Sequence, residues 1–174
     1  VDEKEATIEI RSEITNDATE KATLEVIHQI YDPQGKLQQT LKQRLSVKAG
    51  ETQTVRKTSA IGQPQLWSPE SPRLYEIVTT LRNPKTGMEL DRSTHKTGFR
   101  WFSFDGEKGF SLNGKPYKLR GVNRHQDQAP VGVALDDEAH RRDIRLIKEM
   151  GCNFIRIAYY PQDDALVEAC DEMG

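Results

Sequence analysis

The second half of the chain contains the pattern that most constrains the fold, a strand, a helix and a second strand in succession. A short apolar segment at 119–122 is followed by polar residues, and apolar residues then recur at helical spacing over 139–150. Asp136 or Asp137 marks the helix start, because a carboxylate there can accept hydrogen bonds from first-turn amides. A second apolar segment follows at 152–157. This succession predicts a parallel unit with a right-handed connection.

Polar and aromatic side chains follow each of the two strands, where β/α units place their ligand sites. The residues after the first strand are Asn123, Arg124, His125 and Asp127. The second strand carries Arg156 near its end and is followed by Tyr159 and Tyr160. We therefore place the candidate site at these two strand ends.

The first hundred residues predict short strands separated by turns. Residues 7–14 and 24–30 alternate between apolar and polar side chains, which is the period of a half-buried strand. A Pro-Gly turn at 31–35 follows them. About seven such strands in about 100 residues indicate an immunoglobulin-like β-sandwich. Trp67 lies in a proline-rich turn, and we expect it to be a structural plug rather than a sugar-stacking platform.

Residues 100–117 connect these two patterns. They contain Asn113-Gly114, a strong hairpin signal because both turn positions need positive φ. We therefore predict a mainly β chain with two parts. The first is an immunoglobulin-like β-sandwich domain over residues 1–102, and the second is a truncated β/α segment, a hairpin with two β/α units, over residues 103–174.

Charge and composition exclude several classes of function. The net charge is −2 and the pI is about 6.1, which gives no basic footprint for nucleic acid and no membrane-seeking patch. No apolar run reaches the roughly 18 residues of a transmembrane span. Cys152 and Cys170 have neither metal-ligand spacing nor a CxxC partner, so we expect buried free thiols. The sequence identifies no metal site and no cofactor.

Several motifs together resemble glycoside hydrolase family 2, which contains the β-galactosidases, β-glucuronidases and β-mannosidases. The matching segments are Gly-Val-Asn-Arg-His-Gln-Asp at 121–127, residues 148–156, Tyr160-Pro161, the tail at 166–174, and two segments of the sandwich at 66–75 and 97–100. The resemblance implies that the two parallel strands begin a (β/α)8 barrel, the TIM barrel. It also implies that the Asn-Gly hairpin caps the amino-terminal end of that barrel.

The same resemblance implies which catalytic groups the chain lacks. Most glycosidases use two carboxylates that flank the scissile bond, and in this family both glutamates lie on later barrel strands. Since a complete barrel takes ~250 residues, we expect this chain to be a fragment of a longer enzyme. Alone, it should be inactive, with no catalytic residue of its own. The aspartate pairs at 136–137 and 163–164 are expected to cap helices instead.

Two residues match supporting positions of the family site, and a third lies beside them. Arg156 matches the arginine that holds the nucleophilic glutamate, and a guanidinium beside a carboxylate favours its charged form. His125 matches a histidine that hydrogen-bonds sugar hydroxyls, a task that suits the donor and the acceptor of an imidazole. Asn123 belongs to the same substrate site, as support for the loop.

Two further residues of the substrate site have alternative interpretations. Asp127 can accept a hydrogen bond from a sugar hydroxyl or pair with Arg124. Tyr159 stands where the family usually has a histidine that contacts the sugar. Tyrosine keeps a hydroxyl, but it loses a ring nitrogen and is longer. Either the substrate differs from a plain galactoside or glucuronide, or this position no longer binds.

The sequence thus predicts part of a retaining β-glycoside hydrolase, β-galactosidase-like because of its Arg-His-Gln-Asp motif. β-Glucuronidase and β-mannosidase are the alternatives within the family. A non-catalytic immunoglobulin-like interaction module is the alternative from another class. The expected partner is a β-glycoside or oligosaccharide substrate, with no nucleic acid and no membrane. The open edges of an incomplete barrel also predict self-association. The compartment is left open between a bacterial cytoplasm and periplasm.

Overall fold

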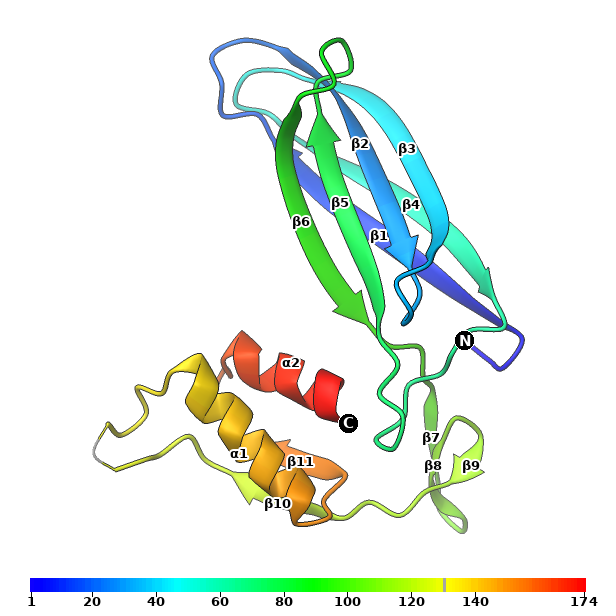
Figure 1. Cartoon of the computed structure of the whole chain (residues 1–174), viewed down its shortest axis with the longest axis vertical. Helices are drawn as coiled ribbons and strands as arrows, with labels where there is room; N and C mark the ends of the chain where they lie inside the picture. The colour runs from blue at the N-terminus through cyan, green and yellow to red at the C-terminus, as the bar shows by residue number, and fades with distance from the viewer. Residues whose placement is uncertain (130) are drawn as a thin grey trace. The chain divides into compact units, whose positions relative to one another are not determined.

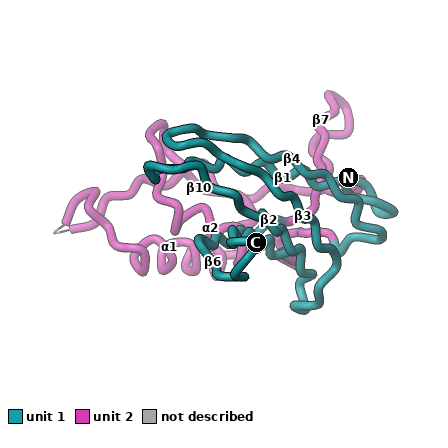
Figure 2. Tube along the Cα trace, turned by 90° about the horizontal axis from the view of Figure 1, so that it is seen from above, with its two compact units in different colours: residues 1–65, 74–97 teal, residues 66–73, 98–174 magenta. Residues whose placement is uncertain are grey.

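The structure, a computed structural model, describes residues 1–129 and 131–174 and is mainly β, as predicted. These residues pack as two compact units (Figure 2). Unit 1 comprises residues 1–65 and 74–97, and unit 2 comprises residues 66–73 and 98–174. The chain therefore passes between the units three times. Within the described ranges, no helix is long and apolar enough to cross a bilayer.

Unit 1 is a β-sandwich of two antiparallel sheets (Figure 1). Its strands are β1 (Glu5–Thr15), β2 (Ala22–Tyr31), β3 (Leu37–Val47), β4 (Thr52–Gly62), β5 (Tyr75–Arg82) and β6 (Glu89–Thr97). β1 pairs with β4, and the other sheet has the order β3-β2-β5-β6. The sequence predicted about seven strands for this sandwich. The described part of unit 1 has six, because the next strand, β7 (Phe102–Asp105), belongs to unit 2.

The interior of the sandwich follows from the alternation along its strands. In β1, Ala6, Ile8 and Ile10 are buried, while the residues between them are exposed. A buried cluster joins both sheets and contains Ile14, Leu24, Val26, Val47 and Val55. Burying one large aliphatic side chain contributes about 1.5–3 kcal/mol. The sandwich is therefore held by apolar contact between its sheets.

His28 is a polar residue of β2 with no exposed surface. Its Nδ1 lies 3.0 Å from the Thr79 hydroxyl, and its Nε2 is buried without a hydrogen-bond partner. Burial lowers the pKa of the His28 imidazole, and the positive charge of Lys57 lowers it further. His28 is therefore held neutral in the folded sandwich, which makes the stability of unit 1 depend on pH.

We expect the free energy of unfolding to decline as the pH falls below about 6.5, the ordinary pKa of histidine. Below this pH, the His28 imidazole binds a proton in the unfolded chain but stays neutral in the folded one. One such proton lowers the free energy of unfolding by up to about 1.4 kcal/mol for each unit that the pH falls. His28→Gln should remove this decline. The exposed His95 gives the control, because His95→Gln should keep it. Urea unfolding between pH 5 and 7 measures both, and a decline that persists unchanged in His28→Gln contradicts the assignment.

Unit 2 begins with a small antiparallel sheet of β7, β8 (Gly109–Leu112) and β9 (Lys115–Pro116). The turn between β8 and β9 is formed by Asn113, with φ 51°, and Gly114, with φ 76°. Both turn residues thus have the positive φ that the Asn-Gly signal predicted.

The remainder of unit 2 is β10 (Gly121–Arg124), α1 (Asp137–Glu149), β11 (Phe154–Ile157) and α2 (Asp164–Met173), with β10 and β11 parallel. The predicted strand, helix, strand succession is therefore confirmed. Asp136 caps α1 by accepting from the Ala139 amide, and Asp163 caps α2 by accepting from the Ala165 amide, both at 2.8 Å. Both predicted aspartate caps are present.

The two parallel strands begin two residues later than the sequence indicated, at residues 121 and 154 instead of 119 and 152. The side chain of Asn153 explains the difference. Its Oδ1 accepts from the backbone amide of Arg120 at 2.7 Å, and the backbone amide of Asn153 donates to the Arg120 carbonyl at 2.9 Å. The Asn153 side chain thus takes the Arg120 amide that a regular ladder would use, so the ladder begins only after this pair, at Gly121 and Phe154.

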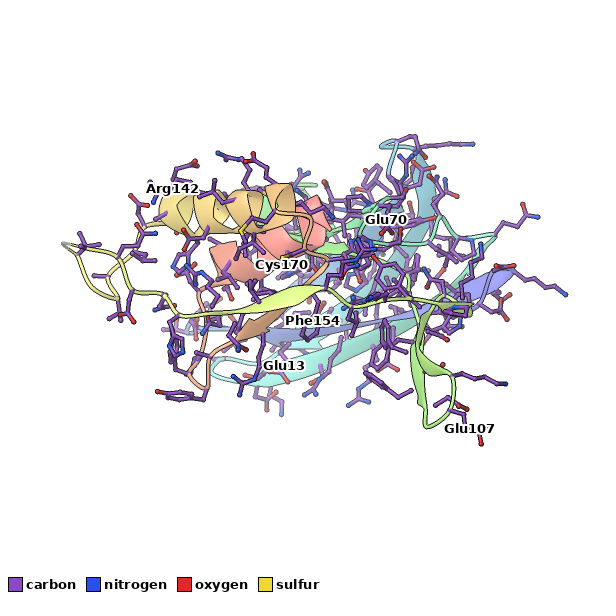
Figure 3. The ribbon with its side chains drawn as sticks, turned by 90° about the horizontal axis from the view of Figure 1, so that it is seen from below. Glu13, Glu70, Glu107, Arg142, Phe154 and Cys170 are labelled. Atoms are coloured by element: carbon purple, nitrogen blue, oxygen red, sulfur yellow. The ribbon has the colours of Figure 1, made fainter. Side chains whose placement is uncertain are left out.

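The helices and β11 enclose a small apolar cluster. Ile144, Leu166 and Ala169 are buried, and Ile155 and Cys170 pack against them. Cys170 lies on α2 and Phe154 on β11 (Figure 3). Both cysteines are free and partly buried, and burial raises the pKa of the Cys170 thiol to about 11. Both thiols are free, as predicted, but neither is fully buried, and only Cys170 packs as a small apolar group of this cluster.

The turn at 66–73 interrupts unit 1 in sequence but packs within unit 2. Trp67 is buried, and its Nε1 donates to the Asp171 carbonyl at 2.7 Å. The Arg100 guanidinium lies 4.6 Å from the centre of the indole ring. The Lys148 ammonium donates to the Pro69 carbonyl at 2.7 Å. Trp67 is thus a structural plug, as expected, and a domain boundary after residue 102 stays a proposal.

Gly98 lies against Trp67 so closely that a side chain has no room. A Cβ at this position would be 2.7 Å from the Trp67 Cβ. We expect Gly98→Ala to lower the free energy of unfolding by about 1–3 kcal/mol, as overpacking does. Gly106→Ala is the control, because its Cβ would meet nothing within 4 Å. Urea midpoints followed by indole fluorescence compare the two, and equal midpoints would show that the contact with Trp67 can relax.

Candidate functional site

The candidate site lies at the carboxyl ends of β10 and β11. The two strands pair in parallel, with Asn123 opposite Arg156 and Arg124 opposite Ile157. His125 follows β10 directly, and Tyr159 and Tyr160 follow β11 by two and three residues. Since both strands end at the same edge of the sheet, side chains 33 to 35 positions apart in sequence meet there.

The alternation of the strands assigns Asn123 and Arg156 to one face of the sheet. Ile155, their neighbour on β11, packs against the helix cluster, so the face of Asn123 and Arg156 is the opposite one. Both side chains are exposed there, and Phe154 on the same face is 48% exposed. Asn123 and Arg156 therefore stand on the face that the helices leave uncovered.

Three aromatic rings gather just beyond the strand ends. The ring centres are 6.1 Å apart for His125 and Tyr159, 6.2 Å for His125 and Tyr160, and 5.9 Å for the two tyrosines. The contacts are edge-on or tilted, which is the favourable geometry for aromatic pairs. Tyr159 is 89% exposed. It offers an apolar face and a hydroxyl together, and a sugar ring has both kinds of surface.

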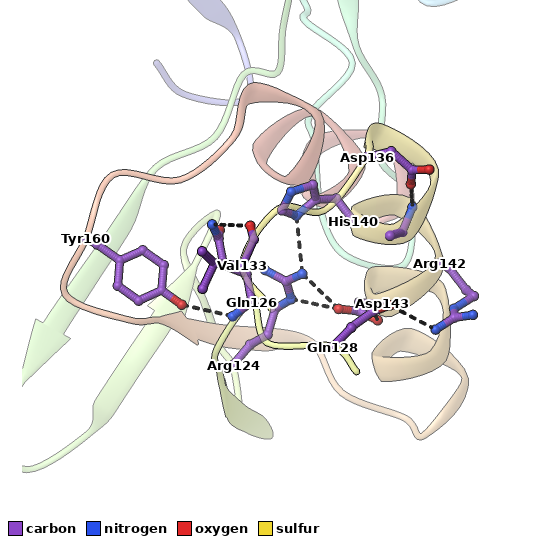
Figure 4. Close-up of polar contacts among 10 residues, drawn as sticks. Arg124, Gln126, Gln128, Val133, Asp136, His140, Arg142, Asp143 and Tyr160 are labelled. Atoms are coloured by element: carbon purple, nitrogen blue, oxygen red, sulfur yellow. Dashed lines mark hydrogen bonds and ion pairs between the residues drawn. The ribbon is translucent and has the colours of Figure 1, made fainter. Parts of the chain in front are cut away.

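Arg124 ties the end of β10 to helix α1 (Figure 4). Its side chain is almost fully buried, and its Nη2 and Nε donate to Asp143 Oδ2 at 2.8 Å and 3.1 Å. Nη2 also lies 3.2 Å from Nδ1 of the buried His140. A guanidinium has only donors, so Nδ1 accepts and the proton of neutral His140 is on Nε2. Arg124 therefore pairs with Asp143 and not with Asp127, which was one of the two alternatives for Asp127.

The loop after β10 is fastened at further points. The Gln126 amide donates to the Tyr160 hydroxyl at 2.9 Å (Figure 4). The backbones of Gln128 and Gly132 exchange hydrogen bonds at 3.0 Å and 2.7 Å. Asp127 lies between these anchored residues and is exposed. The loop thus presents His125 and Asp127 to solvent while the residues around them are held.

The carboxylates near the site do not form a catalytic pair. Asp136 and Asp163 are occupied as helix caps, and the loops after β10 and β11 contain no glutamate. What this part of the chain offers is a cation, an imidazole, an amide, a tyrosine hydroxyl and the single exposed carboxylate of Asp127. These groups can bind and orient a polar ligand, but displacement at a glycosidic carbon needs carboxylates from elsewhere.

Two contributors to the site were missed from the sequence, Asp143 as the partner of Arg124 and Tyr160 as the acceptor for the Gln126 amide. One signal for Asp143 was present, because it lies three residues after His140 and hence on the same face of the helix. No local pattern indicated the bond between Tyr160 and Gln126.

Two domains of one sequence family match the chain. Residues 1–100 match the family described as glycosyl hydrolases family 2, and residues 105–174 match the TIM barrel domain of the same family.

Of three named relatives, two match the whole chain, and the third matches two thirds of it. The crystal structure of a β-glucuronidase from Bacteroides uniformis is 61% identical, with a TM-score of 0.97, and covers 100% of this chain and 21% of its own. A β-galactosidase from Bacteroides ovatus is 34% identical over 175 residues, which are 100% of this chain and 20% of that protein. A β-glucuronidase from Bacteroides fragilis is 43% identical over 115 residues, 66% of this chain and 16% of that protein. The chain thus spans about a fifth of the relatives that it matches throughout.

The pairing of Arg124 with Asp143 leads to a stability prediction. Asp143→Ala leaves a buried guanidinium without its carboxylate, and we expect the free energy of unfolding to fall by about 2–3 kcal/mol. Glu168→Ala removes a carboxylate from an exposed pair with Arg141 and should cost about 1 kcal/mol or less. Urea unfolding compares the two variants. Equal losses would show that the buried pair contributes no more than a surface one.

Proposed function

Because the chain belongs to family 2 of the glycosyl hydrolases, we propose that the full-length protein hydrolyses β-glycosides with retention of configuration. Retaining enzymes use a nucleophilic carboxylate and an acid/base carboxylate about 5–5.5 Å apart. The two β/α units of this chain supply neither, so the later strands of the barrel must supply both. The contribution of this chain is to hold the nucleophile and the sugar.

We propose a β-glucuronide as the substrate. The observation that carries this choice is the 61% identity with the Bacteroides uniformis β-glucuronidase over the whole chain. A β-galactoside, which the Arg-His-Gln-Asp motif favoured, is the second candidate. It is supported by the Bacteroides ovatus β-galactosidase, which is 34% identical over the same length.

Arg156 is proposed to hold the nucleophilic carboxylate. Its exposed position beside Asn123, on the face of the sheet away from the helices, supports this role. A guanidinium beside a carboxylate stabilises the ionised form, which is the form that attacks. Arginine can also donate two parallel hydrogen bonds to one carboxylate and so fix its orientation.

His125, Asp127 and Tyr159 are proposed to contact the sugar. His125 and Asp127 are exposed on the loop after β10, and Tyr159 reaches the same place from the loop after β11. An imidazole and a carboxylate can share the donors and acceptors of neighbouring sugar hydroxyls. The exposed Tyr159 ring can cover an apolar face of the ring or of the leaving group. Asn123, near the end of strand β10, supports the loop that follows it.

A non-catalytic interaction module is the competing class of function. The sandwich alone is compatible with it, because sandwiches of this type serve many purposes. The match of residues 105–174 to the TIM barrel domain of the family favours the enzyme.

An assay of the full-length protein and of this chain tests the proposal. We expect the full-length enzyme to hydrolyse nitrophenyl β-glucuronide with a kcat/KM at least about 100-fold above that for the β-galactoside, since a site built for a polar substituent rejects analogues that lack it. The 174-residue chain should turn over neither. Both should be produced in a host that lacks these two activities. Preference for the galactoside selects the second candidate, and turnover by the chain alone refutes the placement of the catalytic carboxylates.

A further inference from the structure

His125 lies between two anchored residues. On one side, the Arg124 side chain is bound to Asp143 and His140 of α1. On the other side, the Gln126 amide donates to the Tyr160 hydroxyl at 2.9 Å. His125 itself is exposed. Its backbone is therefore held through its two neighbours.

The two anchors differ in what they join. Arg124 ties β10 to the helix that follows it, so it fixes the loop only within its own β/α unit. Tyr160 belongs to the loop after β11, so its hydroxyl joins the loops of two different β/α units. Its ring also lies 6.2 Å from the His125 ring and 5.9 Å from the Tyr159 ring. One side chain thus contacts both exposed rings of the site and the backbone beside one of them.

We propose that Tyr160 is a positioning residue, which sets the His125 imidazole against the substrate by holding the Gln126 amide with its hydroxyl. The proposal rests on the proposed function, in which His125 contacts the sugar. Tyr160 itself is half-buried, and it acts through His125 rather than on the reacting atoms.

The chemistry of the contact limits the role to the hydroxyl. The hydroxyl oxygen accepts from the backbone, which a phenylalanine ring cannot do. The ring contacts with His125 and Tyr159 need only the aromatic body. Tyr160→Phe therefore separates the two contributions, because it removes the backbone anchor and keeps the ring packing.

The hydroxyl of Tyr117 gives a matched control in the same unit. It donates to Glu70 at 2.6 Å and accepts from Asn153 at 3.1 Å, and none of these residues follows β10 or β11.

The first experiment uses the 174-residue chain and needs no activity. In Tyr160→Phe, we expect hydrogen exchange of the Gln126 amide to accelerate about fivefold, the effect of one lost hydrogen bond. Nuclear spin relaxation should show the His125 ring becoming more mobile. Tyr117→Phe should change neither signal. An unchanged Gln126 amide in Tyr160→Phe overturns the anchor, and an unchanged His125 ring overturns the positioning role.

The second experiment uses the full-length enzyme and nitrophenyl β-glucuronide. A contact that matters most in the transition state lowers kcat more than it raises KM, and we expect Tyr160→Phe to reduce kcat about tenfold with little change in KM. Tyr117→Phe should leave both constants within about twofold of the unmodified enzyme. Equal kinetic losses in both variants would reduce Tyr160 to a stability residue and overturn the proposal.

The two experiments separate this inference from the proposed function. Full-length protein that hydrolyses none of the glycosides refutes the proposed function, while the exchange and relaxation measurements still decide whether Tyr160 holds His125. Full-length protein that prefers the galactoside moves the kinetic test to that substrate. In either case, the comparison of Tyr160→Phe with Tyr117→Phe decides whether the Tyr160 hydroxyl positions His125.

Discussion

The buried ion pair between Arg124 and Asp143 is the interaction on which the candidate site depends. Two parallel strands of four residues share few ladder bonds, so the strands alone fix the loops beyond them poorly. The ion pair fastens the end of β10 to α1, and because the Arg124 side chain is almost fully buried, its charge without a partner would be costly. The ion pair thereby fixes the start of the loop that carries His125, which is the next residue along the chain.

The site is polar and open, and its geometry is fixed by the residues that lie behind its exposed side chains. The side chains that face solvent, His125, Asp127, Tyr159 and Arg156, have few contacts that hold them, while the residues behind them are tied to a helix or to the opposite loop. This division leaves the exposed groups free to bind, and it assigns the work of orientation to buried neighbours. It also explains how a chain without a pair of catalytic carboxylates can still carry an ordered part of the proposed substrate site.

The sequence predicted the features that arise from local patterns. Alternation gave the strands, Asp136 and Asp163 gave the helix starts, and Asn113-Gly114 gave the hairpin turn. It also placed Trp67 correctly as a buried plug, although not the carbonyl of Asp171 that its indole meets. The contacts that escaped prediction join distant positions. Arg124 with Asp143, Tyr160 with Gln126, and Asn153 with Arg120 each depend on how two elements pack, which no spacing within one element encodes.

The turn at 66–73 has a consequence for where the chain can be divided. It is encoded between two strands of the sandwich, yet its indole, its proline carbonyl and its glutamate all have their partners in unit 2. A cut after residue 97 would take Trp67 away from Asp171, remove one of the two acceptors of Lys148, and leave the Tyr117 hydroxyl without its acceptor. No single cut in the sequence therefore separates the two units without dismantling contacts of unit 2.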